Sequence, residues 1–305
     1  MKETFDAEWL ALREPVDHRS RAAAAISLLA MAWRRNGWSR VVDLGSGGGS
    51  NLRYLAPRLP GPQRWMLVDH DRELLAQASA PERVEELTCV TADLAGRGLD
   101  AIADCEAQLV TGSALLDLVS REWLGRLVDA CRQAGCAAHF ALIYDGGIEW
   151  HATADDPRPA DDSDDVAMRR AVNAHQRRDK GFGAALGPMA GLVAETAFRA
   201  AGYRVWLLRS PWRLGPDDAQ VAQALVDGWE AAALELSGEG GQVAPGPAGS
   251  GSAGLDPAAV RSWSARRRAT IAGGRFGLTV GHVDLLALPA QPDGPASSRA
   301  APPAT

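Results

Sequence analysis

The sequence predicts an α/β fold with a doubly wound, mostly parallel sheet. Short apolar runs alternate with helical patterns over most of the chain, which is typical of parallel strands joined by crossover helices. The first apolar run leads directly into a glycine-rich loop, as the first strand of such a sheet often does. With 305 residues, of which 46% are hydrophobic, the chain is long enough to bury a substantial core.

Two helices are expected ahead of the sheet, and together they would form an N-terminal helical cap of residues 1–36. They span about 6–13 and 18–36, because Pro15 lies between them and proline breaks a helix. The main domain then covers 37–290. Its seven expected strands lie at 39–45, 64–69, 87–92, 107–112, 137–145, 203–210 and 275–289, and the last two should pair side by side.

Helices are indicated between and after these strands. Ser120 and Asp256 stand where N-cap residues are preferred, and Pro257 fits the first position of its helix. The expected helices cover about 50–59, 71–79, 120–134, 187–201, 217–236 and 255–271.

Three segments lack the pattern of a helix or a strand. Residues 146–185 are polar, acidic and poor in strand-forming residues, and long segments of this kind are often functional. We interpret them as a lid or substrate-binding insert. Residues 237–255 are rich in glycine and predict a flexible linker. The final residues, 291–305, are rich in proline and alanine and predict a disordered tail.

Composition and charge disfavour several classes of function. The net charge is −6, and acidic residues gather at 155–165, which argues against a nucleic acid partner. The longest apolar stretch, 22–33, is too short to span a bilayer, so no membrane partner is expected. The four cysteines form no Cys-x-x-Cys pair, which indicates neither a metal site nor a disulfide framework. The N-terminus lacks the basic and apolar regions of a secretory signal, so we expect a cytoplasmic protein.

The stretch Val-Val-Asp-Leu-Gly-Ser-Gly-Gly-Gly-Ser-Asn, at 41–51, is the strongest functional signal. A glycine loop between a strand and a helix exposes backbone N–H groups, and it lets an anionic or electron-rich ligand approach closely. The dinucleotide fingerprint requires glycine at its first, third and sixth positions. Gly45 and Gly47 satisfy it, but Ser50 takes the sixth place, which counts against an NAD(P)-dependent oxidoreductase.

The pattern is instead an acidic residue followed by alternating glycines, namely Asp43, Gly45, Gly47 and Gly49. It resembles the first motif of the class I, Rossmann-like S-adenosylmethionine-dependent methyltransferases. The resemblance extends over about residues 20–290, apart from the inserted segments. It implies a seven-stranded sheet with an antiparallel last strand, S-adenosylmethionine as the cofactor, and a direct, in-line methyl transfer to an acceptor.

The resemblance also implies roles for residues beyond the loop. Asp69 stands where the family's acidic residue binds the two ribose hydroxyls, and Asp93 stands where the family contacts the adenine amino group. The 26 residues from Asp43 to Asp69 fit one strand–helix–strand unit. Asp71 can cap the next helix, which leaves Asp69 for the ligand. The expected cofactor-binding residues are Asp43, Gly45, Ser46, Gly47, Gly49, Asn51, Asp69, His70, Asp93, Leu94, Thr111 and Ser113.

The sequence defines the methyl acceptor less well than it defines the cofactor. Thr-Gly-Ser-Ala at 111–114 stands where methyltransferases that modify base amino groups have an Asn-Pro-Pro-Tyr type motif. Together with the net charge, this difference favours a small-molecule acceptor. An acceptor that must lose a proton needs a general base, for which His175, Lys180 and His151 are the candidates.

Several questions stay open at the level of the sequence. Arg13, Asp17, Arg19 and Arg21 could meet the cofactor carboxylate, although a brace between the two N-terminal helices is the interpretation that we favour. A non-catalytic S-adenosylmethionine-binding protein and an aminopropyltransferase-like relative remain alternatives to the methyltransferase. Neither the oligomeric state nor the choice among oxygen, nitrogen and carbon as the methylated atom can be read from the residues.

Overall fold

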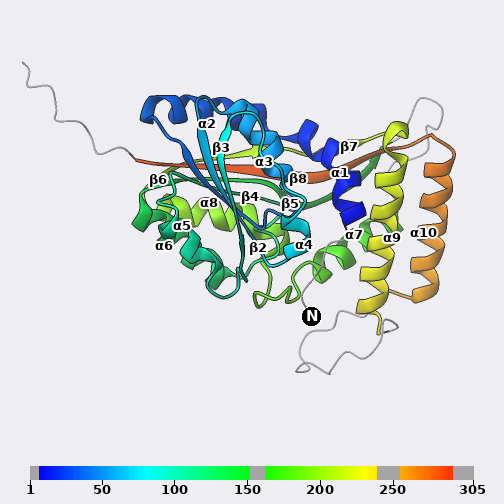
Figure 1. Cartoon of the computed structure of the whole chain (residues 1–305). Coiled ribbons are helices and arrows are strands. Elements are labelled where there is room, and N and C mark those ends of the chain that lie inside the picture. Colours follow the sequence, from blue (N-terminus) through cyan, green and yellow to red (C-terminus); the bar gives the residue numbers. More distant parts are fainter. Residues whose placement is uncertain (1–6, 152–161, 239–254, 291–305) are drawn as a thin grey trace, which may run out of the picture.

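In the computed structural model, which describes residues 7–151, 162–238 and 255–290, a twisted sheet carries helices on both faces (Figure 1). Its strands are β1 (Arg40–Leu44), β2 (Gln63–Asp69), β3 (Val84–Thr91), β4 (Leu109–Ser113), β5 (Ala137–His151), β6 (Tyr203–Arg209), β7 (Trp212–Leu214) and β8 (Gly277–Pro289). They lie in the order β3-β2-β1-β4-β5-β8-β6, and β7 also pairs with β8. The first five strands pair in parallel, whereas β8 is antiparallel to β5, β6 and β7.

This sheet confirms the expected mostly parallel arrangement with an antiparallel last strand. The sequence predicts seven strands, and β7 is an additional one. With only three residues, Trp212–Leu214, it is too short to show an alternating pattern, and it exists because it pairs with the beginning of β8.

The segment at 146–185 is more regular than expected. β5 continues past 145 as far as His151, because its last residues pair with the first residues of β8. Within the same segment, residues Ser163–His175 form helix α7. The expected tail at 291–305 and nearly all of the expected linker at 237–255 lie outside the described residues.

The helices are α1 (Ala7–Ser20), α2 (Ala23–Asn36), α3 (Ser50–Leu55), α4 (Arg72–Leu75), α5 (Ala101–Asp104), α6 (Arg121–Ala134), α7, α8 (Ala190–Ala200), α9 (Ala219–Leu236) and α10 (Pro257–Ala272). The helices α2, α3, α4, α6, α8, α9 and α10 lie in the expected segments, whereas α5 and α7 were not expected. Short 3₁₀ turns are η1 (Ala56–Arg58), η2 (Gly98–Asp100), η3 (Gly187–Met189) and η4 (Pro216–Asp218). Ser120 and Asp256 cap α6 and α10 as expected, each accepting a hydrogen bond from a backbone N–H in the first turn.

The expectation that Pro15 separates two helices was wrong. Helix α1 continues through Pro15, and the chain breaks only at Ala22. An ion pair spans the proline, because Arg13 Nε donates to Asp17 Oδ2 at 2.9 Å one turn further along. The break itself is fixed from outside the helices, since the carboxylate of Asp284 on β8 accepts a hydrogen bond from Ala22 N at 2.8 Å.

Three buried apolar clusters connect the layers. On one face of the sheet, α6 and α8 pack through Trp123 and Phe198. On the opposite face, α2 and α3 pack through Trp33 and Leu52. The third cluster joins the extended ends of β5 and β8 to α7, α9 and α10, and Trp263 is one of its largest buried side chains. The extensions of β5 and β8 therefore form the base of a helical layer beyond the main sheet.

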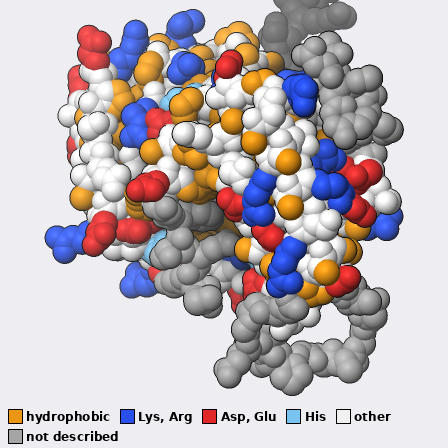
Figure 2. Space-filling model, turned by 90° about the vertical axis from the view of Figure 1, so that its right-hand side faces the viewer, with side chains coloured by type: hydrophobic (Ala, Val, Ile, Leu, Met, Phe, Trp, Pro, Cys, Tyr) orange, Lys and Arg blue, Asp and Glu red, His pale blue; other side chains and the backbone are white. Residues whose placement is uncertain are grey.

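Helices α9 and α10 stand side by side at one end of the sheet (Figure 1). Their outward face carries acidic and basic side chains close to one another (Figure 2). Arg268 lies 2.6 Å from Asp227, and Arg266 lies 2.7 Å from Asp164 on α7. Such exposed pairs contribute about 1 kcal/mol or less each, so the buried cluster beneath them contributes most of the stability of this layer.

Candidate active site

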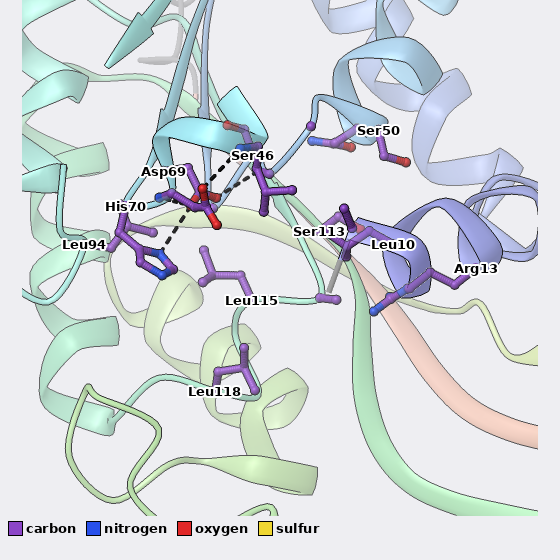
Figure 3. Close-up of a pocket in the computed structure, with 18 of the residues that line it drawn as sticks. Leu10, Arg13, Ser46, Ser50, Asp69, His70, Leu94, Ser113, Leu115 and Leu118 are labelled. Atoms are coloured by element: carbon purple, nitrogen blue, oxygen red, sulfur yellow. Dashed lines mark hydrogen bonds and ion pairs between the residues drawn. The ribbon is translucent and has the colours of Figure 1, made fainter. Parts of the chain in front are cut away.

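A cavity of about 290 Å³ lies at the carboxyl ends of β1, β2 and β4. Parallel strands end together at this edge of the sheet, which is where open α/β sheets bind ligands. The walls are the glycine loop after β1, the residues that follow β2, β3 and β4, the inner face of α1, and the loop at 180–182. Figure 3 shows Asp69 and His70 on one side of this cavity and Arg13 on the other.

The glycine loop turns sharply between β1 and α3. Gly45, Gly47 and Gly49 have φ angles of 64°, 49° and 81°, which are left-handed conformations that favour glycine. Gly45 N donates to the carbonyl of Val68 at 2.8 Å, so the loop folds back onto β2. A Cβ atom at Gly45 would lie 3.5 Å from the side chain of Leu115. The left-handed backbone, and not a lack of space for a Cβ atom, therefore favours glycine at position 45.

Asp69 connects the end of β2 to this loop. Its Oδ2 accepts a hydrogen bond from Gly47 N at 2.8 Å, and its Oδ1 accepts one from Asp71 N at 2.9 Å. His70 Nδ1 lies 3.2 Å from the same Oδ1. Asp71 itself caps α4 by accepting from Glu73 N, as the sequence predicts. The carboxylate of Asp69 is therefore held at the cavity wall by backbone groups and is not needed as a helix cap.

A buried hydrogen-bond network lies directly beneath the cavity. Asn51 Nδ2 donates to Asp43 Oδ1 at 2.8 Å and to Thr111 Oγ1 at 3.1 Å. Asn51 Oδ1 accepts from Arg21 Nη2 at 3.1 Å, and the same nitrogen lies 3.2 Å from Ser113 Oγ. The network links β1 and β4 to the junction between α1 and α2, so the helices over the cavity are tied to its floor.

Burial raises the pKa of Asp43 to about 7. The hydrogen bond from Asn51 and the positive charge of Arg21 oppose this shift, while the negative charge of Asp69 adds to it. Asp43 Oδ2 is buried and has no hydrogen-bond partner in the described residues. The Asp43 carboxyl group consequently changes its charge near neutral pH in the ligand-free protein.

The replacement Asp43→Asn should remove a pH dependence of stability. Asp43 loses its proton near pH 3.8 in the unfolded chain but only near pH 7 in the folded protein. Between these values the folded state binds more protons, so wild-type stability should fall as the pH rises, by up to about 4 kcal/mol relative to Asp43→Asn. Urea unfolding of both proteins across this range measures the difference. A difference that stays constant with pH would show that Asp43 titrates normally.

Helix α1 is docked over the glycine loop by polar contacts. Glu14 accepts from Arg53 Nε at 2.8 Å, and Arg53 Nη1 donates to the carbonyl of Gly48 at 2.6 Å. The hydrogen bond from Arg53 lowers the pKa of Glu14. His18 Nε2 lies 3.1 Å from the carbonyl of Ser50 at the start of α3. These contacts place α1 as a cover on the cavity, in addition to the bracing role expected from the sequence.

Most of the residues expected to bind the cofactor lie together at this cavity. Those that line it are Gly45, Ser46, Gly47, Asn51, Asp69, His70, Asp93, Leu94 and Ser113. Asp43 and Thr111 are fully buried beneath Asn51 and do not reach the cavity. Gly49 is the N-cap residue of α3, behind the loop. Their contact with a ligand remains a prediction.

The three candidates for a general base lie in different places. Lys180 lines the cavity. His175, at the end of α7, lies outside it, with Nε2 2.9 Å from a carboxylate oxygen of Glu235 on α9. Burial lowers the pKa of His175, although the hydrogen bond with Glu235 opposes this. His151 also lies outside the cavity, with Nε2 2.7 Å from Thr279 Oγ1.

Helix α1 contributes four residues to the cavity, of which the sequence suggested Arg13 and Asp17 as alternatives to a brace and did not indicate Leu10 and Glu14. Leu10, Arg13, Glu14 and Asp17 follow the i, i+3, i+4, i+7 spacing, so they share one face of the helix. That spacing is visible in the sequence. It was obscured by the assumption that Pro15 ends the helix, because a break there would place Asp17 outside it.

Two general findings concern the part of the chain that the structure describes. There, no cluster of three or more histidine, cysteine, aspartate or glutamate side chains has the geometry to hold a metal ion. In the same residues, no helix is both long enough and apolar enough to cross a membrane.

Comparison with known proteins finds only remote likenesses. No family model and no curated protein matches the chain. A cyclopropane-fatty-acyl-phospholipid synthase-like protein from Lactobacillus casei ATCC 334 is 13% identical, and the match covers 90% of this chain and 98% of that one with a TM-score of 0.48. A SAM-dependent methyltransferase from Geobacter sulfurreducens, solved with S-adenosyl-L-homocysteine, is 16% identical over 89% and 92% of the two chains, with a TM-score of 0.39. A SAM-dependent methyltransferase from Archaeoglobus fulgidus is 13% identical over 86% and 93%, with a TM-score of 0.38.

Because these likenesses are remote, the sheet itself decides the fold. Its strand order places β1 in the centre, with β2 and β3 on one side and β4 and β5 on the other. An antiparallel β8 lies between β5 and β6. The glycine loop follows β1, and an acidic residue, Asp69, ends β2 beside it. On this arrangement, the chain has the fold of the class I S-adenosylmethionine-dependent methyltransferases.

Proposed function

We propose that this protein binds S-adenosylmethionine in the cavity and transfers its methyl group to a small-molecule acceptor. The observation that carries the proposal is the Asp69 carboxylate, which is fixed at the cavity wall by Gly47 N and Asp71 N. An ionised carboxylate has about four acceptor sites, and these two donors occupy one on each oxygen. His70 Nδ1 lies 3.2 Å from Oδ1, so the freer acceptor site is on Oδ2. A carboxylate at this wall suits the hydroxyls of a ribose, because such charge-assisted hydrogen bonds are strong.

The other walls suit the remaining parts of the cofactor. Asp93 and Leu94 at the end of β3 lie on the adenine side, and His70 lines the same side. The glycine loop and Ser113 lie on the methionine side. Beneath them, Arg21 is 6% exposed, and its Nε and Nη1 have no hydrogen-bond partner in the described part of the chain. A buried cation with unused donors favours a carboxylate nearby, which the methionine end provides.

The chain's own contribution to the reaction is positioning. When bound, S-adenosylmethionine supplies a methyl group on a sulfonium, which is already activated for transfer. Helix α1 and the residues after β4 cover the cavity, so they exclude water and hold an acceptor in line, a contribution that can reach about 7–11 kcal/mol of the barrier. Lys180 is the proposed acceptor contact or proton acceptor among the three candidates, because it alone of His151, His175 and Lys180 lines the cavity.

Methyl transfer is tested with methyl-labelled S-adenosylmethionine and a fractionated metabolite extract. We expect label in a small, extractable product together with release of S-adenosylhomocysteine, and no label in added RNA or DNA. Binding of the cofactor without transfer to any fraction would indicate a non-catalytic binding protein. Turnover of decarboxylated S-adenosylmethionine alone would indicate an aminopropyltransferase-like enzyme.

A further inference from the structure

We propose that the acceptor is an organic acid with an apolar body, and that Arg13 on α1 binds its carboxylate. The inference rests on the proposed methyl transfer and concerns the half of the cavity that lies opposite Asp69 and His70. Figure 3 shows the Arg13 side chain reaching from α1 toward the open centre of the cavity.

Arg13 is held in a fixed orientation by its neighbours. Its Nε donates to Asp17 Oδ2 at 2.9 Å, and its Nη2 donates to Asp17 Oδ1 at 3.3 Å. The guanidinium carbon lies 5.1 Å from the ring centroid of Trp212 and 5.9 Å from that of Trp9, within the range of cation–π attraction. Three contacts therefore fix a side chain that would be flexible on an open surface.

In this orientation Asp17 occupies one edge of the Arg13 guanidinium, and the other edge remains for a second carboxylate. A guanidinium has five N–H donors and presents two edges that fit a carboxylate, one through Nε and one Nη, and one through both Nη atoms. Asp17 takes the first edge. In the described residues no acceptor is assigned to Arg13 Nη1, and Arg13 lines the cavity. The second edge is therefore suited to a carboxylate that enters with the acceptor.

Arg13 is largely shielded from solvent, which strengthens a contact between its guanidinium and a carboxylate. The side chains of Arg13 and Asp17 are only 11% and 9% exposed. Burial, followed by the positive charge of Arg13, lowers the pKa of the nearby His282 to about 3. His282 is consequently neutral, and it packs against Trp212 with ring centroids 5.0 Å apart. Arg13 therefore lies beside a buried, uncharged ring and has little contact with solvent, which reduces the screening of its charge.

The walls around Arg13 indicate an apolar body for the acid. Leu10 on the same helix lines the cavity, and Leu115 and Leu118 line it from the segment after β4 (Figure 3). Under the proposed function the cofactor carboxylate is assigned to the region of Arg21, which donates to Asn51 and Ser113 beneath the glycine loop. That assignment leaves Arg13 for the acceptor.

The test uses simple carboxylates as probes of protein saturated with S-adenosylhomocysteine. Benzoate, phenylacetate, 2-naphthoate and octanoate are titrated by calorimetry, each beside its neutral amide. We expect at least one acid to bind and its amide to bind at least tenfold more weakly. Arg13→Lys keeps a cation beside Asp17 but lacks the second edge, so it should weaken binding of that acid at least tenfold. Arg19→Lys is the matched control, because Arg19 lies on the same helix, binds Asp218 at 2.6 Å and does not line the cavity.

Several results would overturn the inference. They are binding of no acid to the loaded protein, equal binding of acid and amide, and an unchanged affinity in Arg13→Lys with a normal melting temperature. A tenfold loss of S-adenosylhomocysteine affinity in Arg13→Lys would also overturn it, because Arg13 would then belong to the cofactor. Failure of the proposed function is distinguishable, because the wild type would then either not bind S-adenosylhomocysteine or bind the cofactor without transferring its methyl label to any fraction.

Discussion

Asp69→Ala should weaken the binding of S-adenosylhomocysteine at least about 100-fold. Two hydrogen bonds from ribose hydroxyls to a carboxylate contribute about 1.5–3 kcal/mol each, and the substitution removes both. It also removes the acceptor for Gly47 N, which holds the glycine loop against the end of β2. Both effects act on the same ligand, so the loss should exceed that of any other single substitution at the cavity. Calorimetric titration of the two proteins measures the ratio.

Two further variants test whether the loss of affinity comes from the carboxylate of Asp69. Asp69→Asn keeps the size of the side chain and one acceptor oxygen, so it should lose less affinity than Asp69→Ala. Asp129→Ala on α6 removes a carboxylate that is 65% exposed and does not line the cavity. This variant should bind S-adenosylhomocysteine with the affinity of the wild type. Equal affinities in wild type and Asp69→Ala, with both proteins folded, would exclude Asp69 from the ligand site.

The second large effect is expected on stability. Asp284 is fully buried on β8, where its two oxygens accept from Ala22 N at 2.8 Å and from Leu142 N at 2.9 Å. Leu142 has a φ angle of 54°, which is strained for a side chain of that size. Asp284→Ala would leave both donors without a partner and the buried cation of Arg21 less compensated. We expect a loss of about 3–5 kcal/mol in the free energy of unfolding.

Chemical denaturation of Asp284→Ala and two comparison variants checks this expectation. Asp284→Asn retains one acceptor and should lose less stability. Asp227→Ala removes an exposed carboxylate that pairs with Arg268, and should change the stability by about 1 kcal/mol or less. A loss in Asp284→Ala no larger than that in Asp227→Ala would mean that Asp284 does not fix the start of α2.

The sequence predicted the elements whose signals are local. The strand before Gly45, the cap at Ser120 and the apolar run of the final strand all depend on residues close together in the chain. The position of Asp69 beside the glycine loop also followed, because one strand–helix–strand unit fixes which strands are neighbours.

The features that the sequence did not predict depend on distant contacts. The break before α2 is set by Asp284, which lies 262 residues further along the chain from Ala22. His175 lies outside the cavity and contacts Glu235, 60 residues away in the chain. The extension of β5 as far as His151 depends on its pairing with the first residues of β8. The position of α1 over the cavity depends on the contact between Glu14 and Arg53 in α3. No local pattern encodes these pairings, so they appear only once the chain is folded.

A crystal structure of the protein grown with S-adenosylhomocysteine tests the central claim most directly. The account predicts the nucleoside in the cavity, with both ribose hydroxyls within hydrogen-bond distance of the Asp69 carboxylate and the amino-acid end over the loop at 45–47. An S-adenosylhomocysteine molecule bound elsewhere, or a cavity that stays empty at saturating ligand, would contradict it.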